Sequence, residues 1–446
     1  MGSFPAERHA PAGAHRPAGA AGAPPRPRGA LVAGSVGNLV EWYEFGVYGY
    51  FATVIAANFF TPEGGGAAEA LVRAYASFAL AFFFRPVGAA LFGRVGDRIG
   101  RRPTLIMVLL LMTGATTLIG LLPTYATAGA AAPWLLTLLR VLQGLSAGGE
   151  FGGAVAVMTE FAPPGRRGLY GAWQSFTVAL GLLGGAGVAA VLATVLTEAQ
   201  LYAWGWRLPF VLTLPLGLCA LWLRLRLAET PSFRRAGPGT ATAADASRGE
   251  VARAIAVGVG RVMGWSAAGY TFLVVLPSYL QNTLDASFRQ ALVATVLANL
   301  GFAAAILPAG ALSDRIGRRP VMVAGCVLVT LLALPLLHLL RDPGAPVAVK
   351  GAGLLAAGAV VGLMAGPGPA MLAEMFPTHV RYTGLGLAYA LSNAVFSGCA
   401  GLLVTEAIER TGNADIPAHY VMVTCAVSAL ALAGLRDGAH RRTLRD

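Results

Sequence analysis

Long apolar segments alternate with short polar connections along the chain. A helix needs about 20 apolar residues to cross a bilayer. By this measure the predicted spans are residues 30–52, 71–93, 104–123, 132–158, 168–195, 207–227, 254–281, 289–312, 320–340, 350–373, 383–405 and 417–436. The polar stretch 228–253 separates the first six spans from the last six. The pattern therefore predicts an all-α membrane protein with twelve transmembrane helices.

The composition indicates that lipid is the main solvent. The chain is 56% hydrophobic and 12% charged, whereas a soluble domain carries about 25% charged residues. The net charge of +12 would suit a nucleic-acid partner, but the basic residues cluster between apolar runs. If the N-terminus is inside, 24 arginines lie in inner connections and tails, against six basic residues in outer connections. The positive-inside rule therefore predicts a multi-pass membrane protein with both termini cytoplasmic and no nucleic-acid partner.

The other polar features indicate neither an enzyme nor a cofactor. The cysteines lie inside apolar runs without metal-ligand spacing, and the histidines lie in tails, connections or span ends, so we expect no metal site. The sequence has no Gly-x-x-x-x-Gly-Lys motif, so ATP is not expected as the energy source within this chain. Residues 1–29 lack the apolar region of a signal peptide and are predicted to form a disordered cytoplasmic tail. Residues 437–446 are predicted to form a second cytoplasmic tail.

Two motifs recur in the same order in the two halves of the chain. The residues Asp-Arg-Ile-Gly-Arg-Arg-Pro at 97–103 recur 217 positions later, at 314–320. Glu160 and Arg167 recur as Glu374 and Arg381, at an offset of 214. The repetition predicts two six-helix bundles, residues 30–227 and 254–436, joined by a cytoplasmic linker at 228–253. Duplicated halves around a midplane site are typical of secondary transporters.

The repeated Gly-x-x-x-Asp-Arg-x-Gly-Arg-Arg motif resembles the signature loop of the major facilitator superfamily. Within that superfamily, three stretches resemble the bacterial metabolite:proton symporters: Glu41–Gly49, Phe84–Gly88 and Arg140–Gly153. The family usually has aspartate at the position where this chain has Glu44. A carboxylate is present in both cases, so the function of this position is expected to be kept. The resemblance implies that the protein is a bacterial inner-membrane symporter. It would carry a small organic solute together with protons by alternating access.

In this superfamily the repeated loops latch neighbouring helices together on the cytoplasmic side. The resemblance therefore implies a gating role for both copies of the loop and for the second motif pair. These residues are Gly93, Asp97, Arg98, Gly100, Arg101, Arg102, Glu160, Asp314, Arg315, Gly317, Arg318, Arg319, Glu374 and Arg381.

A few ionisable residues lie inside the predicted spans, where each costs about 2.5–3.5 kcal/mol on insertion. They are Glu41, Glu44, Arg85, Arg140, Glu150 and Arg261. Glu41 and Glu44 are three positions apart and share one helix face, and two close carboxylates in a low dielectric do not both stay ionised. Related proton-coupled sugar carriers use an acid of the first span with an arginine of the fourth. That resemblance implies Glu44 as the proton site and Arg140 as its partner, with Glu41 and Glu150 as alternatives. Glu41 is otherwise expected to pack against Arg85.

The substrate is expected to be a carboxylate metabolite. The candidate binding residues are Arg85, Arg140, Arg261, Tyr43, Gln143 and Tyr270. Arg261 favours a carboxylate if it faces the cavity, and it has no such role if it reaches the inner interface instead. A zwitterion such as proline or betaine is the alternative substrate, and a channel-like facilitator without proton coupling is the alternative of another class. We expect a monomer whose partners are the solute, protons and lipid.

Overall fold

A computed structural model describes residues 27–61, 66–99, 101–160, 162–225, 248–376 and 378–435. Within these ranges the regular elements are helices. The predicted N-terminal tail up to residue 26, the linker residues 228–247 and the C-terminal tail lie outside the described residues. The first helix begins at Pro27 and the first helix after the linker at Arg248, slightly before the predicted starts of spans 1 and 7.

The first half of the chain folds into helices that run back and forth six times. Its elements are α1 (Pro27–Tyr50), α2 (Ala52–Ile55), the π-helical turn η1 (Ala56–Phe60), α3 (Ala67–Ile99), α4 (Arg101–Leu121), α5 (Tyr125–Ala128), α6 (Ala131–Ala147), α7 (Phe151–Glu160), α8 (Arg167–Val195), α9 (Glu198–Gln200), the π-helical turn η2 (Leu201–Gly205), α10 (Arg207–Val211) and α11 (Thr213–Leu225).

The second half repeats this arrangement. Its elements are α13 (Arg248–Tyr270), the π-helical turn η3 (Thr271–Val275), α14 (Leu276–Leu284), α15 (Phe288–Ile316), α16 (Arg318–Arg341), α17 (Val347–Ala365), α18 (Gly368–Met375), α19 (Thr378–Ser392), the π-helical turn η4 (Asn393–Gly398), α20 (Ala400–Thr411) and α21 (Ile416–Ala433).

Ten helical segments in the described part of the chain are long and apolar enough to cross a membrane. The other two predicted spans are helical as well, and both carry buried charges that lower their hydropathy. One is α1, which contains Glu41 and Glu44. The other is α6 followed by α7, a span that is interrupted by a turn at 148–150 and carries Arg140 and Glu150. The protein is therefore an all-α membrane protein, as the apolar pattern predicts.

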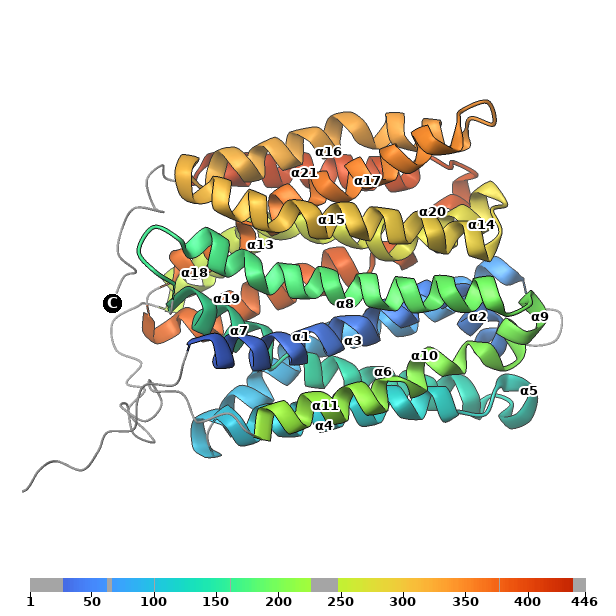
Figure 1. Ribbon diagram of the computed structural model, residues 1–446, viewed down its shortest axis with the longest axis horizontal. Helices are drawn as coiled ribbons and strands as arrows, with labels where there is room; N and C mark the ends of the chain where they lie inside the picture. Colours follow the sequence, from blue (N-terminus) through green and yellow to red (C-terminus); the bar gives the residue numbers. More distant parts are fainter. Residues whose placement is uncertain are drawn as a thin grey trace, which may run out of the picture.

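The helices lie side by side along one axis and form two groups (Figure 1). In that view the second half, with α15, α16, α17 and α21, lies above the first half, with α1, α4, α8 and α11. Helices α8 and α15 pack against each other where the two groups meet. We call the end that carries the α15–α16 connection the inner end, because the arginine distribution predicts that it is cytoplasmic.

The two halves contact each other at both ends of the bundle. At the outer end, the hydroxyl groups of Tyr75 and Ser278 lie 2.8 Å apart. At the inner end, the carboxylate of Asp314 accepts hydrogen bonds from the backbone N–H groups of Gly168 (2.7 Å) and Leu169 (2.9 Å). The two halves are therefore held together at both ends of the bundle.

Glycines allow α3 and α6 to pack at backbone contact. A Cβ atom at Gly144 would lie 1.9 Å from the carbonyl oxygen of Ala81, and one at Gly148 would lie 2.0 Å from that of Arg85. A Cβ atom at Gly88 would meet the backbone of Leu145 in the same way. Small residues permit this approach between membrane helices, and it brings Arg85 and Arg140 into the same region of the bundle.

The second copy of the repeated motif is almost entirely helical. Asp314 lies in the last turn of α15 and Arg318 begins α16, so Gly317 alone connects the two helices. Its φ of 100° lies in a region that side-chain-bearing residues rarely adopt. The glycine of the motif is therefore required by the sharp reversal that places Asp314 and Arg318 next to each other.

Candidate functional site

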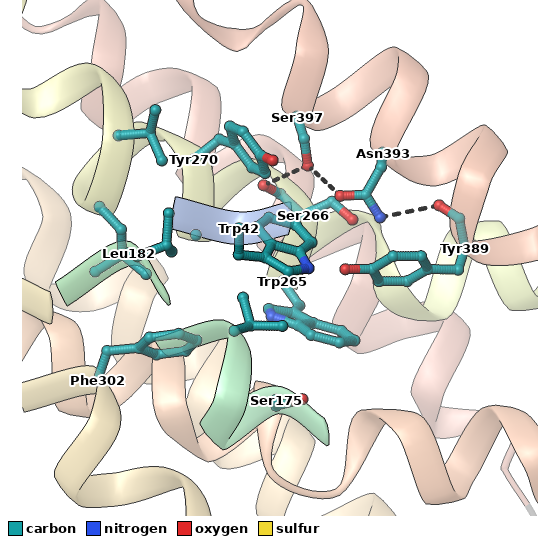
Figure 2. A pocket seen from close by; sticks show the side chains of 14 residues that line it. Trp42, Ser175, Leu182, Trp265, Ser266, Tyr270, Phe302, Tyr389, Asn393 and Ser397 are labelled. Carbon is teal, nitrogen blue, oxygen red and sulfur yellow. Dashed lines mark hydrogen bonds between the residues drawn. The ribbon is translucent and has the colours of Figure 1, made fainter. Parts of the chain in front are cut away.

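A cavity lies between the two halves, near the middle of the bundle (Figure 2). The volume of the cavity in this conformation is about 30 Å³. The first half contributes residues from α1 and α8, and the second half contributes residues from α13, η3, α15, α19 and η4. The lining residues are Trp42, Ser175, Val178, Leu182, Trp265, Ser266, Gly269, Tyr270, Leu273, Val274, Phe302, Tyr389, Asn393 and Ser397.

Aromatic rings form much of the cavity wall. The ring centroids of Trp42 and Tyr270 are 6.1 Å apart, and those of Trp265 and Tyr389 are 5.6 Å apart. Figure 2 shows the hydroxyl of Tyr389 directed toward the two indole groups. Behind it, Tyr389 stacks on Phe151 with centroids 3.5 Å apart. The stack fixes the Tyr389 ring between the cavity and the inner end.

The polar groups of the cavity wall are neutral. The hydroxyl of Ser397 lies 3.1 Å from the carbonyl oxygen of Ser266 and 2.8 Å from the side-chain oxygen of Asn393, and its single proton can be donated to only one of them at a time. The side-chain nitrogen of Asn393 donates to the carbonyl of Tyr389 (2.9 Å). The hydroxyl of Tyr270 is buried and has no hydrogen-bond partner among the described residues. No charged side chain is present in the described lining of the cavity. The wall therefore offers ring faces and uncharged hydrogen-bonding groups to a ligand.

Two π-helical turns, η3 and η4, contribute to this wall. Each interrupts a membrane helix close to the cavity, η3 after Tyr270 and η4 from Asn393 onward. Wide turns of this kind are frequent at functional sites because they redirect side chains and free carbonyl groups. The side-chain nitrogen of Asn299, from α15, donates to the carbonyl of Leu273 in η3 (3.1 Å). The turn is thus tied to a neighbouring helix.

Arg85 and Glu41 lie just behind Trp42. The guanidinium of Arg85 packs over the rings of Trp42, Phe45 and Phe82, with distances to the centroids of 5.4, 4.3 and 4.1 Å. Its Nη2 lies 3.9 Å from the Glu41 carboxylate. Nε and Nη2 of Arg85 have no hydrogen-bond partner in the described part of the chain. The predicted association of Glu41 with Arg85 is thus present as a loose ion pair next to the cavity.

Glu44 and Arg140 are linked through two neutral side chains. Thr116, on α4, lies 2.9 Å from the Glu44 carboxylate and 2.5 Å from the amide nitrogen of Gln143. The amide oxygen of Gln143 accepts from Arg140 at 2.5 Å. The Arg140 guanidinium also lies over the ring of Tyr48, 4.1 Å from its centroid. Glu44 and Arg140, predicted as partners, are therefore joined through this bridge and not by direct contact.

Glu150 forms an ion pair with an arginine that was not among the predicted site residues. Its carboxylate contacts the guanidinium of Arg224 on α11, which also donates to the carbonyl oxygen of Leu105 on α4 (2.7 Å). Both side chains are buried. Gly37 on α1 leaves the space for this pair, because a Cβ atom there would overlap Arg224. The geometry assigns Glu150 to packing among helices of the first half.

At the inner end, the second copy of the motif joins the two halves. Arg318 donates to Asp314 (2.7 Å) and to Glu374 (3.0 Å). Asp314 in turn accepts from the first turn of α8 in the other half, where the helix dipole favours an anion. The side chains of the first copy, namely Gly93, Asp97, Arg98, Gly100, Arg101 and Arg102, lie outside the described residues, as do those of Glu160 and Arg381.

Of the predicted substrate-binding residues, only Tyr270 lines the cavity. Tyr43 donates instead to the carbonyl of Pro209, and Arg261 donates to the carbonyl of Ala431 on α21 (3.3 Å). Gln143 and Arg140 belong to the bridge to Glu44. These four side chains point to other helices because the sequence of one helix does not fix which of its faces meets the cavity.

Most residues of the cavity wall were not among the predicted binding residues. Trp42 and Trp265 are aromatic residues inside spans, where core or interface positions are the usual explanation. Tyr389, Asn393 and Ser397 recur at intervals of four. Such spacing places side chains on one helix face, so it is a signal in the sequence that could have indicated this wall.

The comparisons with known proteins agree with this architecture. The family description "Sugar (and other) transporter" matches residues 30–248, and that of the Major Facilitator Superfamily matches residues 259–436. A D-xylose-proton symporter has a similar fold, with a TM-score of 0.72 at 20% identity over 94% of this chain and 99% of that chain. A proton:xylose symporter bound to 6-bromo-6-deoxy-D-glucose gives a TM-score of 0.76 at 18% identity, over 91% of this chain and 94% of that chain.

Sequence relatives cover nearly the whole chain. The proline/betaine transporter of Escherichia coli (strain K12) is 34% identical over 426 residues, 93% of this chain and 84% of the relative. A glycine betaine/proline/ectoine/pipecolic acid transporter of Dickeya dadantii is 34% identical over 434 residues, with the same coverage. An inner membrane metabolite transport protein of Escherichia coli (strain K12) is 36% identical over 380 residues, 83% of this chain and 85% of the relative. The chain therefore belongs to the major facilitator superfamily of secondary transporters, which are not enzymes, and within it to the family that contains the proline/betaine transporters.

Proposed function

We propose that this protein is a proton-coupled symporter of a zwitterionic solute of the proline or betaine type. The observation that carries the proposal is the cavity wall, in which the rings of Trp42, Trp265, Tyr270 and Tyr389 combine with neutral hydroxyl and amide groups. A ring face attracts a desolvated ammonium group by about 2 kcal/mol or more, and aromatic cages bind quaternary ammonium ligands. The names of the relatives support the same class of solute.

The carboxylate end of such a solute needs a donor. The buried hydroxyl of Tyr270 lacks a partner among the described residues and belongs to the cavity wall. Ser266 supplies a second hydroxyl, which lies 3.1 Å from that of Ser392. Neutral donors suit a single carboxylate that is already balanced by the ammonium of the same molecule. A metabolite with two or three carboxylates would need cationic side chains, and the described wall has none. The zwitterion alternative therefore replaces the carboxylate expectation.

Proton coupling is assigned to Glu44. Its side chain is fully buried in α1, and its Oε1 has no hydrogen-bond partner among the described residues. An unpaired charge at this depth is expensive, so exchange of a proton at this carboxylate changes the energy of the conformation that buries it. Trp42, two residues away on the same helix, lies in the cavity wall. Proton binding and solute binding thus act on one helix.

Uptake by the purified protein in proteoliposomes tests the proposal. With an imposed pH gradient, acid outside, we expect accumulation of radiolabelled betaine or proline, and no accumulation of succinate. Trp265→Leu should raise the KM for betaine about 2- to 30-fold, the value of one cation–π contact, whereas Trp265→Phe should raise it less. Trp134, which is 76% exposed on α6, provides the control Trp134→Leu. Accumulation of succinate without betaine or proline would contradict the assignment of the solute class.

A further inference from the structure

Thr116 lies on α4 between two charged residues of other helices. Its hydroxyl oxygen has three neighbours: the Glu44 carboxylate at 2.9 Å, the Gln143 amide nitrogen at 2.5 Å and the carbonyl oxygen of Met112 at 3.0 Å. On the far side of Gln143, its amide oxygen accepts from Arg140 at 2.5 Å. Thr116, Gln143, Glu44 and Arg140 are all fully buried. The hydrogen bonds that link Glu44 to Arg140 through Thr116 and Gln143, which we call the bridge, are therefore shielded from bulk water.

The chemistry of these groups fixes most of the hydrogen-bond directions. An arginine only donates, so the oxygen of the Gln143 amide must face Arg140 and its nitrogen must face Thr116. The hydroxyl oxygen of Thr116 therefore accepts from Gln143. A hydroxyl has a single proton, so Thr116 can donate either to Glu44 or to the carbonyl of Met112, but not to both.

We infer that Thr116 is a positioning residue that connects the proton on Glu44 to Arg140 by reversing one hydrogen bond. When Glu44 is ionised, each donor in the series Arg140, Gln143, Thr116 points toward the carboxylate, and the cation and anion form a bridged pair. When Glu44 is protonated, its O–H donates to Thr116, and Thr116 donates to Met112. The series then ends on a backbone carbonyl, and the link between Arg140 and an anion is lost.

Other charges surround Glu44 and must be kept constant in any test. Glu41 and Tyr43 on α1 and Glu150 in the turn after α6 interact electrostatically with it, and Arg140 on α6 is linked to it through the bridge. Arg85 of α3 and Arg224 of α11 lie beside Glu41 and Glu150. A substitution at Thr116 leaves all of them in place. A change in the titration of Glu44 in such a variant can then be attributed to the hydroxyl group.

Removal of the hydroxyl should favour the protonated form of Glu44. Thr116→Val keeps the shape of the side chain but removes both its donor and its acceptor. Hydrogen bonds to an ionised group are about twice as strong as neutral ones. The ionised form of Glu44 therefore loses more stabilisation than the protonated form when the hydroxyl is removed. We expect the midpoint of Glu44 deprotonation to move to higher pH by about one pH unit. Thr116→Ser keeps the hydroxyl, and its midpoint should match that of the wild type.

Infrared titration of the purified full-length protein in lipid measures this midpoint directly. The C=O stretching band of protonated Glu44 is identified as the band that is missing in Glu44→Gln, and its intensity is followed against pH. The inference rests on the proton-coupling role proposed above, but the measurement needs no substrate. A failure to transport betaine would therefore leave this result unaffected, and the two proposals can fail separately.

The adjacent residue Thr117 provides a matched control. Its hydroxyl lies 3.1 Å from that of Thr213 and is not part of the bridge, so Thr117→Val should not move the midpoint. An unchanged midpoint in Thr116→Val, an equal shift in Thr117→Val, or no band missing in Glu44→Gln would each overturn the inference. If Thr116→Val does not fold, Gln143→Met breaks the same bridge one bond further away. Its midpoint must also rise, and an unchanged value there would overturn the inference as well.

Discussion

Asp314→Asn should open the inner end of the transporter. In the structure the Asp314 carboxylate accepts from Gly168 and Leu169 of the other half and from Arg318 of its own half, so these contacts close the inner end at this point. An asparagine keeps one acceptor oxygen, but its NH2 group must face a donor, either a backbone N–H of α8 or the guanidinium. Arg318 stays in place because it also contacts Glu374. The change therefore weakens the contact between the halves more than the structure of either half.

The magnitude follows from the bonds that are lost. One hydrogen bond to a charged acceptor contributes about 1.5–3 kcal/mol, and an unsatisfied buried donor adds a cost of similar size. Part of this is recovered by water when the end opens, so we take about 2–3 kcal/mol as the net effect. Each 1.4 kcal/mol is a factor of ten. The ratio of inward-open to closed molecules should then rise by about 30- to 150-fold, since the lost contact exists only when the inner end is closed.

Alkylation of a cavity residue reports this ratio. Ser175 lines the cavity and is buried, so Ser175→Cys, in a protein whose four native cysteines are replaced, becomes reactive only when a path opens. In inside-out vesicles, a membrane-impermeant maleimide should label this cysteine about 30-fold faster or more when Asp314→Asn is present. The control is Asp342→Asn, because Asp342 accepts from Gly344 within its own turn. A labelling rate that is unchanged or lower in Asp314→Asn would refute the reasoning.

Three further predictions follow from the contacts of the first half. Glu44→Gln should abolish accumulation driven by a pH gradient while solute counterflow in proteoliposomes persists; accumulation at the wild-type ratio would exclude Glu44 as the coupling acid. Gly144→Ala should lower the stability of the solubilised protein by about 1–3 kcal/mol, because its methyl group would meet the backbone of α3, whereas Gly114→Ala has open space and should not lower the melting temperature. Glu150→Gln should cost about 3–5 kcal/mol in the same assay, since it leaves the Arg224 charge buried without its anion. Adding Arg224→Met should recover part of that loss, and no recovery would argue against the ion pair as the cause.

The helices were the most predictable part of this protein. A bilayer requires about 20 apolar residues per span, and this requirement alone identifies α8, α15 and α16 closely. The arrangement of charges around Gly317 also follows from the sequence, because the repeated motif contains the glycine that the reversal needs. The π-helical turn η3 was not predictable, because Thr271–Val275 is an apolar run without glycine or proline. Its sequence is typical of an uninterrupted membrane helix. Its wide turn is stabilised by tertiary contacts, such as that of Asn299, that a single segment does not encode.

Charge pairing was predictable in kind but not in detail. A buried charge is costly, so the sequence indicates that acids and arginines inside spans must find partners. Which partner each one finds depends on helix rotation and on relative height, and these are properties of the packed bundle. Arg224 lies at the inner end of α11, and from the sequence it is interpreted as a basic residue that sets the orientation of the protein in the membrane. In the structure it forms an ion pair with Glu150. Thr116 and Gln143 carry no charge and therefore give no signal in a search for ionisable residues, although they connect Glu44 to Arg140.

Most of the predicted binding residues do not line the cavity, and the physical reason is the same. Buried charges are the most conspicuous feature of the sequence, and the binding candidates were chosen largely among them. In the structure these charges are mostly neutralised by one another within the first half, and the cavity between the halves is left to aromatic and neutral side chains. Helix α1 belongs to both systems, because Trp42 lines the cavity and Glu44 binds Thr116. If the solute binds against Trp42 and the proton binds Glu44, as proposed, a rotation or shift of α1 that alters the fit of the solute also moves Glu44 relative to Thr116. A single rigid helix would then be sufficient to couple the two events.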